Sequence, residues 1–133
     1  MGAWGSGPFE NDGALDFLGE GATRDTIAEV LRRCAEAAPG DYLDVDDGQM
    51  ALAAAELVAL GFGYGNLLAA PSQARAAARG LGPDEALRQL ALRAIPNLQN
   101  PKRSELADLW GHDPGFATRL CDLLSRLTDA GPA

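Results

Sequence analysis

Apolar residues recur at intervals of three and four positions along most of the chain, and this spacing predicts α-helices. The pattern is clear at Ile27, Leu31, Cys34 and Ala38, with charged residues at most of the positions between them. It returns in the last segment, between residues 116 and 127. No segment alternates apolar and polar residues in the manner of a half-buried strand. The hydrophobic pattern therefore predicts a helical protein.

Residues that begin or end helices divide the pattern into segments. Polar side chains that can cap a helix precede each segment, and Gly or Pro follows most of them. Helices are expected from 11 or 12 to 18, over 23–38, over 47–60, from 82–85 to 95, over 104–110 and from 113 to about 128. We expect Asp46 or Asp47 to cap the third of these, and Ile95-Pro96 to end the fourth. Residues 61–82 are harder to divide; a glycine-rich loop over 61–66 precedes a short helix that should end at Gly80.

The length and composition fit one domain. The chain has 133 residues, of which only 3 are Val, 2 are Ile and 4 are Thr, the β-branched residues that strands favour. We therefore predict an all-α fold, a single compact domain of six or seven helices over 1–133. Residues 1–10 should form an irregular segment packed on it.

The charge is acidic and unevenly spread. The formal net charge is −8; residues 1–70 carry 12 acids and 3 bases, and residues 71–133 carry 7 acids and 8 bases. A negative protein does not neutralise phosphates, so we expect no nucleic-acid partner. A basic protein partner is expected instead, because complementary charge speeds association.

Two features bear on location and redox chemistry. Residues 50–70 are apolar apart from Glu56, but three glycines interrupt them, so we expect no membrane span. The opening of the chain lacks the pattern of a signal peptide, which predicts a cytoplasmic protein. Cys34 and Cys121 lie on or beside apolar stripes, and both are expected to be buried.

The most distinctive motif is WGSGPFEND, residues 4–12, followed by Asp16 and Phe17. This opening closely resembles that of small bacterial proteins grouped as domain of unknown function 4259. The segments AAAE at 53–56 and SELADLW at 104–110 are also similar to that family. The resemblance implies a bacterial source and one helical domain, and it brings no activity or cofactor.

The motif has two interpretations. In the structural one, Trp4 and Phe9 anchor the N-terminus to the domain, while Asn11 and Asp12 cap the first helix. In the functional one, these side chains rim a polar binding pocket made of Trp4, Glu10, Asn11, Asp12 and Asp16.

Glu56 is a second candidate, because it stands in an apolar helix where burial without a partner is costly. Either an Arg or another donor pairs with it, or it acts as a general base or metal ligand beside the N-terminal acids. Two other constellations fail on pattern. The acids from Asp44 to Asp47 lack the spacing of a calcium loop, and His112 with Cys121 lacks an orienting third group.

Two functions follow from these observations. The first is a non-catalytic interaction protein without a cofactor, whose acidic face meets a basic partner. The alternative is a small carboxylate-based metal-binding protein or hydrolase, centred on Glu56 and the N-terminal acids.

Overall fold

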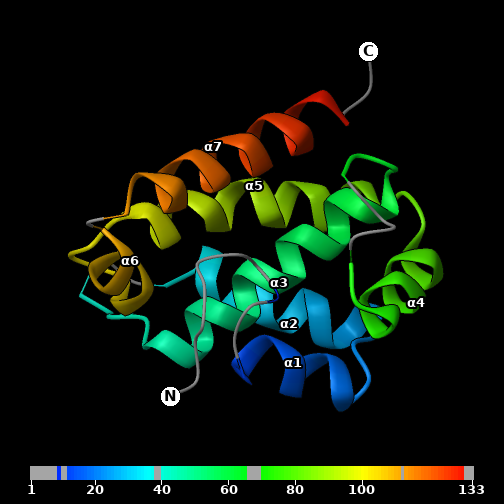
Figure 1. Cartoon of the computed structure of the whole chain (residues 1–133), viewed down its shortest axis with the longest axis horizontal. Coiled ribbons are helices and arrows are strands. Elements are labelled where there is room, and N and C mark those ends of the chain that lie inside the picture. The colour runs from blue at the N-terminus through cyan, green and yellow to red at the C-terminus, as the bar shows by residue number, and fades with distance from the viewer. Residues whose placement is uncertain (1–8, 10–11, 38–39, 66–69, 112, 131–133) are drawn as a thin grey trace.

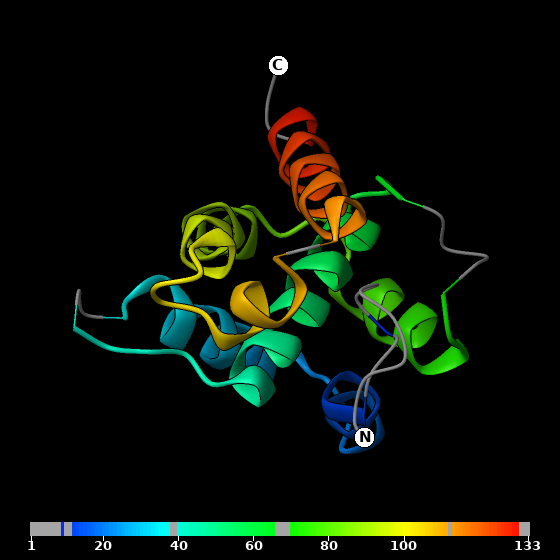
Figure 2. The same ribbon diagram turned by 60° about the vertical axis from the view of Figure 1, so that its left-hand side comes forward.

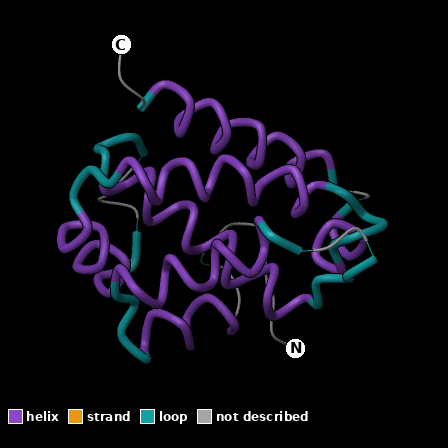
Figure 3. The backbone as a smooth tube through the Cα atoms, turned by 180° about the vertical axis from the view of Figure 1, so that it is seen from behind, coloured by secondary structure: helices purple, strands orange, loops and turns teal. Residues whose placement is uncertain are grey.

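A computed structural model describes residues 9, 12–37, 40–65, 70–111 and 113–130, and within them it contains seven α-helices and no strand (Figure 1). The helices are α1 (Asp12–Gly19), α2 (Arg24–Ala35), α3 (Val45–Gly61), α4 (Ser72–Leu81), α5 (Glu85–Gln99), α6 (Glu105–Trp110) and α7 (Pro114–Asp129). Loops connect the helices throughout the described chain (Figure 3). The all-α prediction is confirmed.

Helix α3 is the centre of the arrangement, because each of the other six helices packs against it. It runs diagonally through the molecule, with α5 and α7 side by side above it and α1 below it in Figure 1. Its interior residues from 51 to 60 are buried except Glu56. Five of them are alanines, whose small side chains let neighbouring helices come close. An apolar helix buried on most sides is what the sequence predicts for this segment.

Most helix starts coincide with the polar caps expected from the sequence. The caps of α2, α6 and α7 are Thr23, Ser104 and Asp113, and each side chain accepts a hydrogen bond from a backbone N–H of the first turn. The expected cap of α3 was wrong. Asp44 is the cap residue, and its carboxylate accepts from the N–H of Asp47 at 2.8 Å. The helix therefore begins two residues before the expected position.

Helix α5 continues through Pro96 to Gln99, so the expected end at Ile95-Pro96 was wrong. Proline removes one helical hydrogen bond, and contacts with the rest of the fold offset this loss of stability. Ile95 and Leu98 on either side of it are fully buried, while Pro96 itself is exposed. Asn97 then donates its side-chain amide to the carbonyl of Cys34 in α2 at 2.8 Å.

The ambiguous segment 61–82 resolves around two glycines. Helix α4 ends at Leu81, with Gly82 as its cap residue at φ +57°, so the expected end at Gly80 is one residue early. The end of α3 lies directly against this turn. A Cβ placed on Gly61 would stand 2.7 Å from the carbonyl oxygen of Gly82, so only glycine allows the two segments to approach this closely.

Arginines satisfy helix ends that packing would otherwise leave without partners. Arg103 donates to the carbonyl of Ala37 at 2.7 Å and to the side chain of Asn97 at 2.9 Å, just beyond the C-terminus of α2. Arg88 is buried and donates to the carbonyl of Leu127 at 3.0 Å, in the last turn of α7. Such bonds supply donors to the last carbonyls of a helix, which have no partner within it.

The two cysteines have different surroundings. Cys34 is buried between α2 and α5, and its thiol contacts the carbonyl of Ala94 at 3.4 Å. Burial raises the pKa of the Cys34 thiol to about 12. Cys121 is exposed on α7, so its expected burial was wrong. It stands at the edge of the apolar stripe, and the neighbouring helices cover only the stripe's centre, at Leu120, Leu123 and similar positions.

None of the described helices combines the length and apolar character that crossing a membrane requires. Of the first ten residues the structure describes Phe9, which is partly buried against the core. The proposed packing of the rest of this segment lies outside the described residues.

Candidate functional site

The structure describes only some of the N-terminal candidate residues. Trp4, Glu10 and Asn11 lie outside the described residues, as does the side chain of Asp12, the first residue of α1. Asp16 is exposed one turn further along that helix. The pocket proposed around the motif therefore stays a prediction.

Glu56 is held by an arginine from the far end of the chain. Its side chain is 12% exposed, and both carboxylate oxygens accept from Arg126 of α7, one of them at 2.8 Å. Among the described residues this guanidinium is its partner, as the structural interpretation of Glu56 predicted. A bidentate pair of this kind fixes both groups in one geometry.

Arg126 extends the pair into a small network. Its Nε donates to Asp122 at 2.8 Å, and Nη1 also donates to the carbonyl of Tyr64 at 3.2 Å. The hydrogen bonds that Arg126 donates to Glu56 raise the pKa of Arg126, and the Asp122 carboxylate adds to the effect. The network ties α3, α7 and the loop after α3 together. With both oxygens occupied, Glu56 is not presented as an open ligand or base.

The carboxylates of the described residues do not gather into a metal site. No group of three or more His, Cys, Asp or Glu side chains in this part of the chain is placed to hold an ion. Asp44, the first acid of the segment compared with a calcium loop, caps α3 instead.

The acids of residues 41–47 are joined on the surface by acids of α6, whose contribution the sequence did not predict. We define the acidic face as residues 41–47 together with residues 105–108 of α6. The two segments are joined where Leu43 pairs with Ser104 in an isolated parallel bridge. The N–H of Leu43 donates to the carbonyl of Arg103 at 2.8 Å, and the N–H of Glu105 donates to the carbonyl of Leu43 at 2.9 Å. The carboxylate of Glu105 then accepts from the N–H of Val45 at 2.7 Å, which satisfies the start of α3.

This joint brings together acids from both halves of the chain. Residues 41–49 contain four acids and residues 104–117 contain three, and neither stretch contains Lys or Arg. The exposed acids of the face are Asp41, Asp44, Asp46, Glu105 and Asp108. In Figure 2 the 41–44 segment passes beneath α6 on its way into α3. The second half of the chain is nearly neutral overall, and for that reason the charge count did not reveal the contribution of α6.

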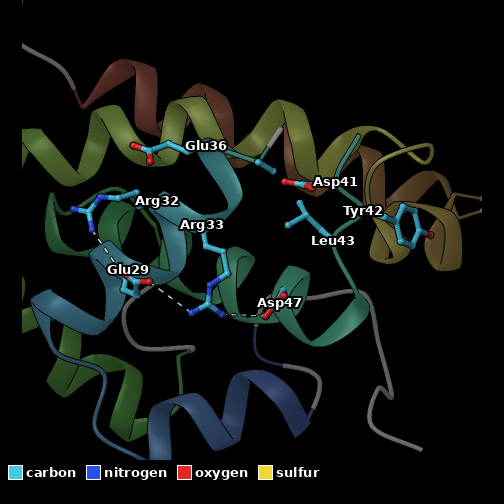
Figure 4. A pocket seen from close by; sticks show the side chains of 9 residues that line it. Glu29, Arg32, Arg33, Glu36, Asp41, Tyr42, Leu43 and Asp47 are labelled. Carbon is cyan, nitrogen blue, oxygen red and sulfur yellow. Dashed lines mark hydrogen bonds and ion pairs between the residues drawn. The ribbon is translucent and has the colours of Figure 1, made fainter. Parts of the chain in front are cut away.

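Tyr42 stands within this face and is 53% exposed. Partial burial of the ring raises the pKa of the Tyr42 hydroxyl, and repulsion from the carboxylates of Asp108 and Glu105 adds to the shift. Tyr42 lies beside α6 in Figure 4, and much of the residue remains open to solvent. Sequence reasoning missed Tyr42. The available signal was a single aromatic residue in an acidic segment.

A cleft of about 430 Å³ opens between α2 and the acidic face (Figure 4). Its lining residues are Glu29, Arg32, Arg33, Glu36, Ala37, Asp41, Tyr42, Leu43 and Asp47. Arg33 reaches across it toward Asp47 at 3.5 Å, and it also lies 3.6 Å from Glu29, one turn earlier in α2 (Figure 4). These separations are longer than those of a good charged hydrogen bond, and the side chain of Arg33 is half exposed. Such pairs contribute little to stability and exchange readily with other charged groups.

A comparison with protein families bears on all of these elements together. The sequence pattern of one family matches residues 2–119, which include the opening motif, α3 and α6. The chain belongs to the family described as domain of unknown function DUF4259. The family predicted from the sequence resemblance is thereby confirmed. The DUF4259 match covers both segments of the acidic face but brings no activity to them. No curated protein and no solved structure matches the chain.

Proposed function

We propose that this protein is a non-catalytic interaction module whose acidic face binds a basic protein partner. The observation that carries the proposal is the joint between residues 41–47 and α6. It places acids from two distant segments around the half-exposed Tyr42, with no basic residue in either segment.

The composition of this face suits protein recognition. Tyrosine combines a large apolar ring with a hydroxyl, and it is enriched among residues that dominate binding energy. The surrounding carboxylates attract a positively charged partner and speed its association. The same charge repels the phosphates of nucleic acids.

The loosely paired charges of the adjoining cleft extend the surface. Arg33 lies 3.6 Å from Glu29 and 3.5 Å from Asp47, so a guanidinium or ammonium group of a partner can compete for these carboxylates. The Glu56 network differs in this respect, because its carboxylate is nearly buried and tightly bound. The structure thus supports the acidic face as the more accessible of the two carboxylate clusters.

The test compares two variants of equal charge. In the first, Asp41, Asp46 and Asp108 are changed to Asn; none of them caps a helix. In the matched control, Glu20→Gln, Asp25→Asn and Asp129→Asn remove three exposed acids from the turn after α1, the first turn of α2 and the end of α7. Each purified protein is immobilised, and a series of lysine- and arginine-rich peptides is passed over it at low and high salt.

We expect salt-sensitive retention by the wild type and the control, and a loss of at least about tenfold in affinity in the variant of the acidic face. Circular dichroism of both variants should match the wild type. Equal loss in both variants would mean that only net charge matters, and the proposed face would then be wrong.

A further inference from the structure

On the other side of α6 from Tyr42 lies a pocket of about 230 Å³, formed where the end of α5, α6 and the start of α7 meet. Its lining includes Trp110, Phe116 and Leu120, with the small side chains of Ala107 and Ala117 at its walls. Leu109, next to Trp110 in α6, is 48% exposed but does not line the pocket. The pocket is therefore a mostly apolar hollow between three helices.

The charged residue that lines this pocket is acidic. It is Asp113, and a second acid, Asp108, lies nearby in the sequence, in α6. The whole stretch from 104 to 117, which supplies α6 and the start of α7, carries three acids and no Lys or Arg. An occupant of this pocket therefore meets apolar side chains and the carboxylate of Asp113.

We propose that the pocket receives one aliphatic or aromatic side chain of the same basic partner, at a position flanked by arginine or lysine. This inference rests on the proposed function and adds an anchor to it. The volume is below the roughly 300 Å³ at which small-molecule sites begin, and it suits a single side chain. Buried anchors surrounded by polar rims are the usual source of affinity in protein interfaces.

The charge also distinguishes between a foreign partner and a second copy of this chain. A second copy with a net charge of −8 would bring its own carboxylates against Asp108 and Asp113. Like charges placed together in an interface oppose association. A basic segment is instead attracted by the carboxylates near the pocket and by those of the acidic face, because α6 contributes to both.

The experiment fills the pocket without changing charge. Ala117 is exposed on α7 and lines the pocket, so Ala117→Phe should occupy it with little strain in the core. Ala76→Phe is the matched control, the same change at an exposed alanine of α4, a helix remote from α6. Peptides of twelve residues are selected from a random displayed library on the full wild-type chain, and the affinities of the recovered peptides are then measured for each variant.

We expect the recovered peptides to combine Arg or Lys with one Leu, Phe or Trp. Their affinity should fall at least about tenfold in Ala117→Phe and less than about twofold in Ala76→Phe. Basic peptides that bind Ala117→Phe as well as wild type would overturn the anchor and leave the proposed function intact. Recovery of peptides without basic residues, or of none above background, would count against both. Self-association of the wild type that Ala117→Phe abolishes would make the occupant a second copy and overturn the inference.

Discussion

The pair between Glu56 and Arg126 allows a quantitative prediction about a carboxylate that the sequence offered as either structural or functional. The two side chains are 12% and 20% exposed. Breaking a fully buried pair costs about 3–5 kcal/mol, and an exposed pair is worth about 0–1 kcal/mol. A pair at this depth should fall between these limits.

The two single substitutions should not cost the same. In Glu56→Gln, Arg126 keeps Asp122 and the carbonyl of Tyr64 as partners, so we expect a loss of about 1–2 kcal/mol in the free energy of unfolding. In Arg126→Met, the carboxylate of Glu56 is left nearly buried and without its guanidinium, and the loss should be about 2–3 kcal/mol. The double variant should cost less than the sum, by about 1.5 kcal/mol.

Urea denaturation followed by circular dichroism at neutral pH measures all three variants. Arg93→Met is the matched control. It removes a half-exposed arginine that lies 3.7 Å from Glu36, and it should cost less than about 0.5 kcal/mol. A Glu56→Gln variant as stable as the wild type, or more stable, would refute the structural role of Glu56. A carboxylate that serves function rather than folding adds no stability, so removing it leaves the protein as stable or makes it more stable. That result would therefore favour the interpretation of Glu56 as a metal ligand or general base.

Three further predictions test the packing. Native protein should show one thiol that reacts with a disulfide reagent at pH 8, Cys121, because burial keeps Cys34 protonated, and unfolded protein should show two; two reactive thiols in the native state would contradict this. Gly61→Ala should lower the melting temperature, because the added Cβ would meet the backbone at Gly82. Gly80→Ala has open space around it and should raise the free energy of unfolding by about 0.5–1 kcal/mol. A Gly61→Ala variant as stable as the wild type would disprove the close approach of α3 to the turn after α4. Arg24 donates a hydrogen bond to Asp84 and thereby lowers the pKa of this carboxyl. The stability that the Asp84 carboxylate adds is therefore present above about pH 4 and is lost as pH falls through the lowered pKa. Asp84→Asn keeps a side chain that can cap α5. In urea titrations its free energy of unfolding should be lower than that of the wild type, and this difference should shrink below about pH 4. A difference that stays constant with pH would contradict the stabilising role of the Asp84 carboxylate.

Much of the fold follows from local rules. Apolar residues at helical spacing and the caps Thr23, Ser104 and Asp113 predict helices that the structure contains. Local rules failed where distant contacts outweighed them. Pro96 should end α5, but the buried residues on either side of it and the bond from Asn97 to α2 keep the helix intact.

The candidate site depends more strongly on tertiary structure. The sequence predicts that Glu56 needs a partner, because an apolar helix desolvates its charge. It does not say which arginine, since Arg126 is 70 residues away and reaches Glu56 only because α7 packs on α3.

By itself the sequence determined the helical class, most helix starts and the acidity of residues 41–47, because each depends on neighbours within a few positions. Only the tertiary structure decided that α6 adds its carboxylates to that segment. The reason is the pairing of Leu43 with Ser104, two residues far apart in the chain, which no pattern of neighbouring residues predicts. That one contact turns an acidic loop and a short helix into a single face around Tyr42.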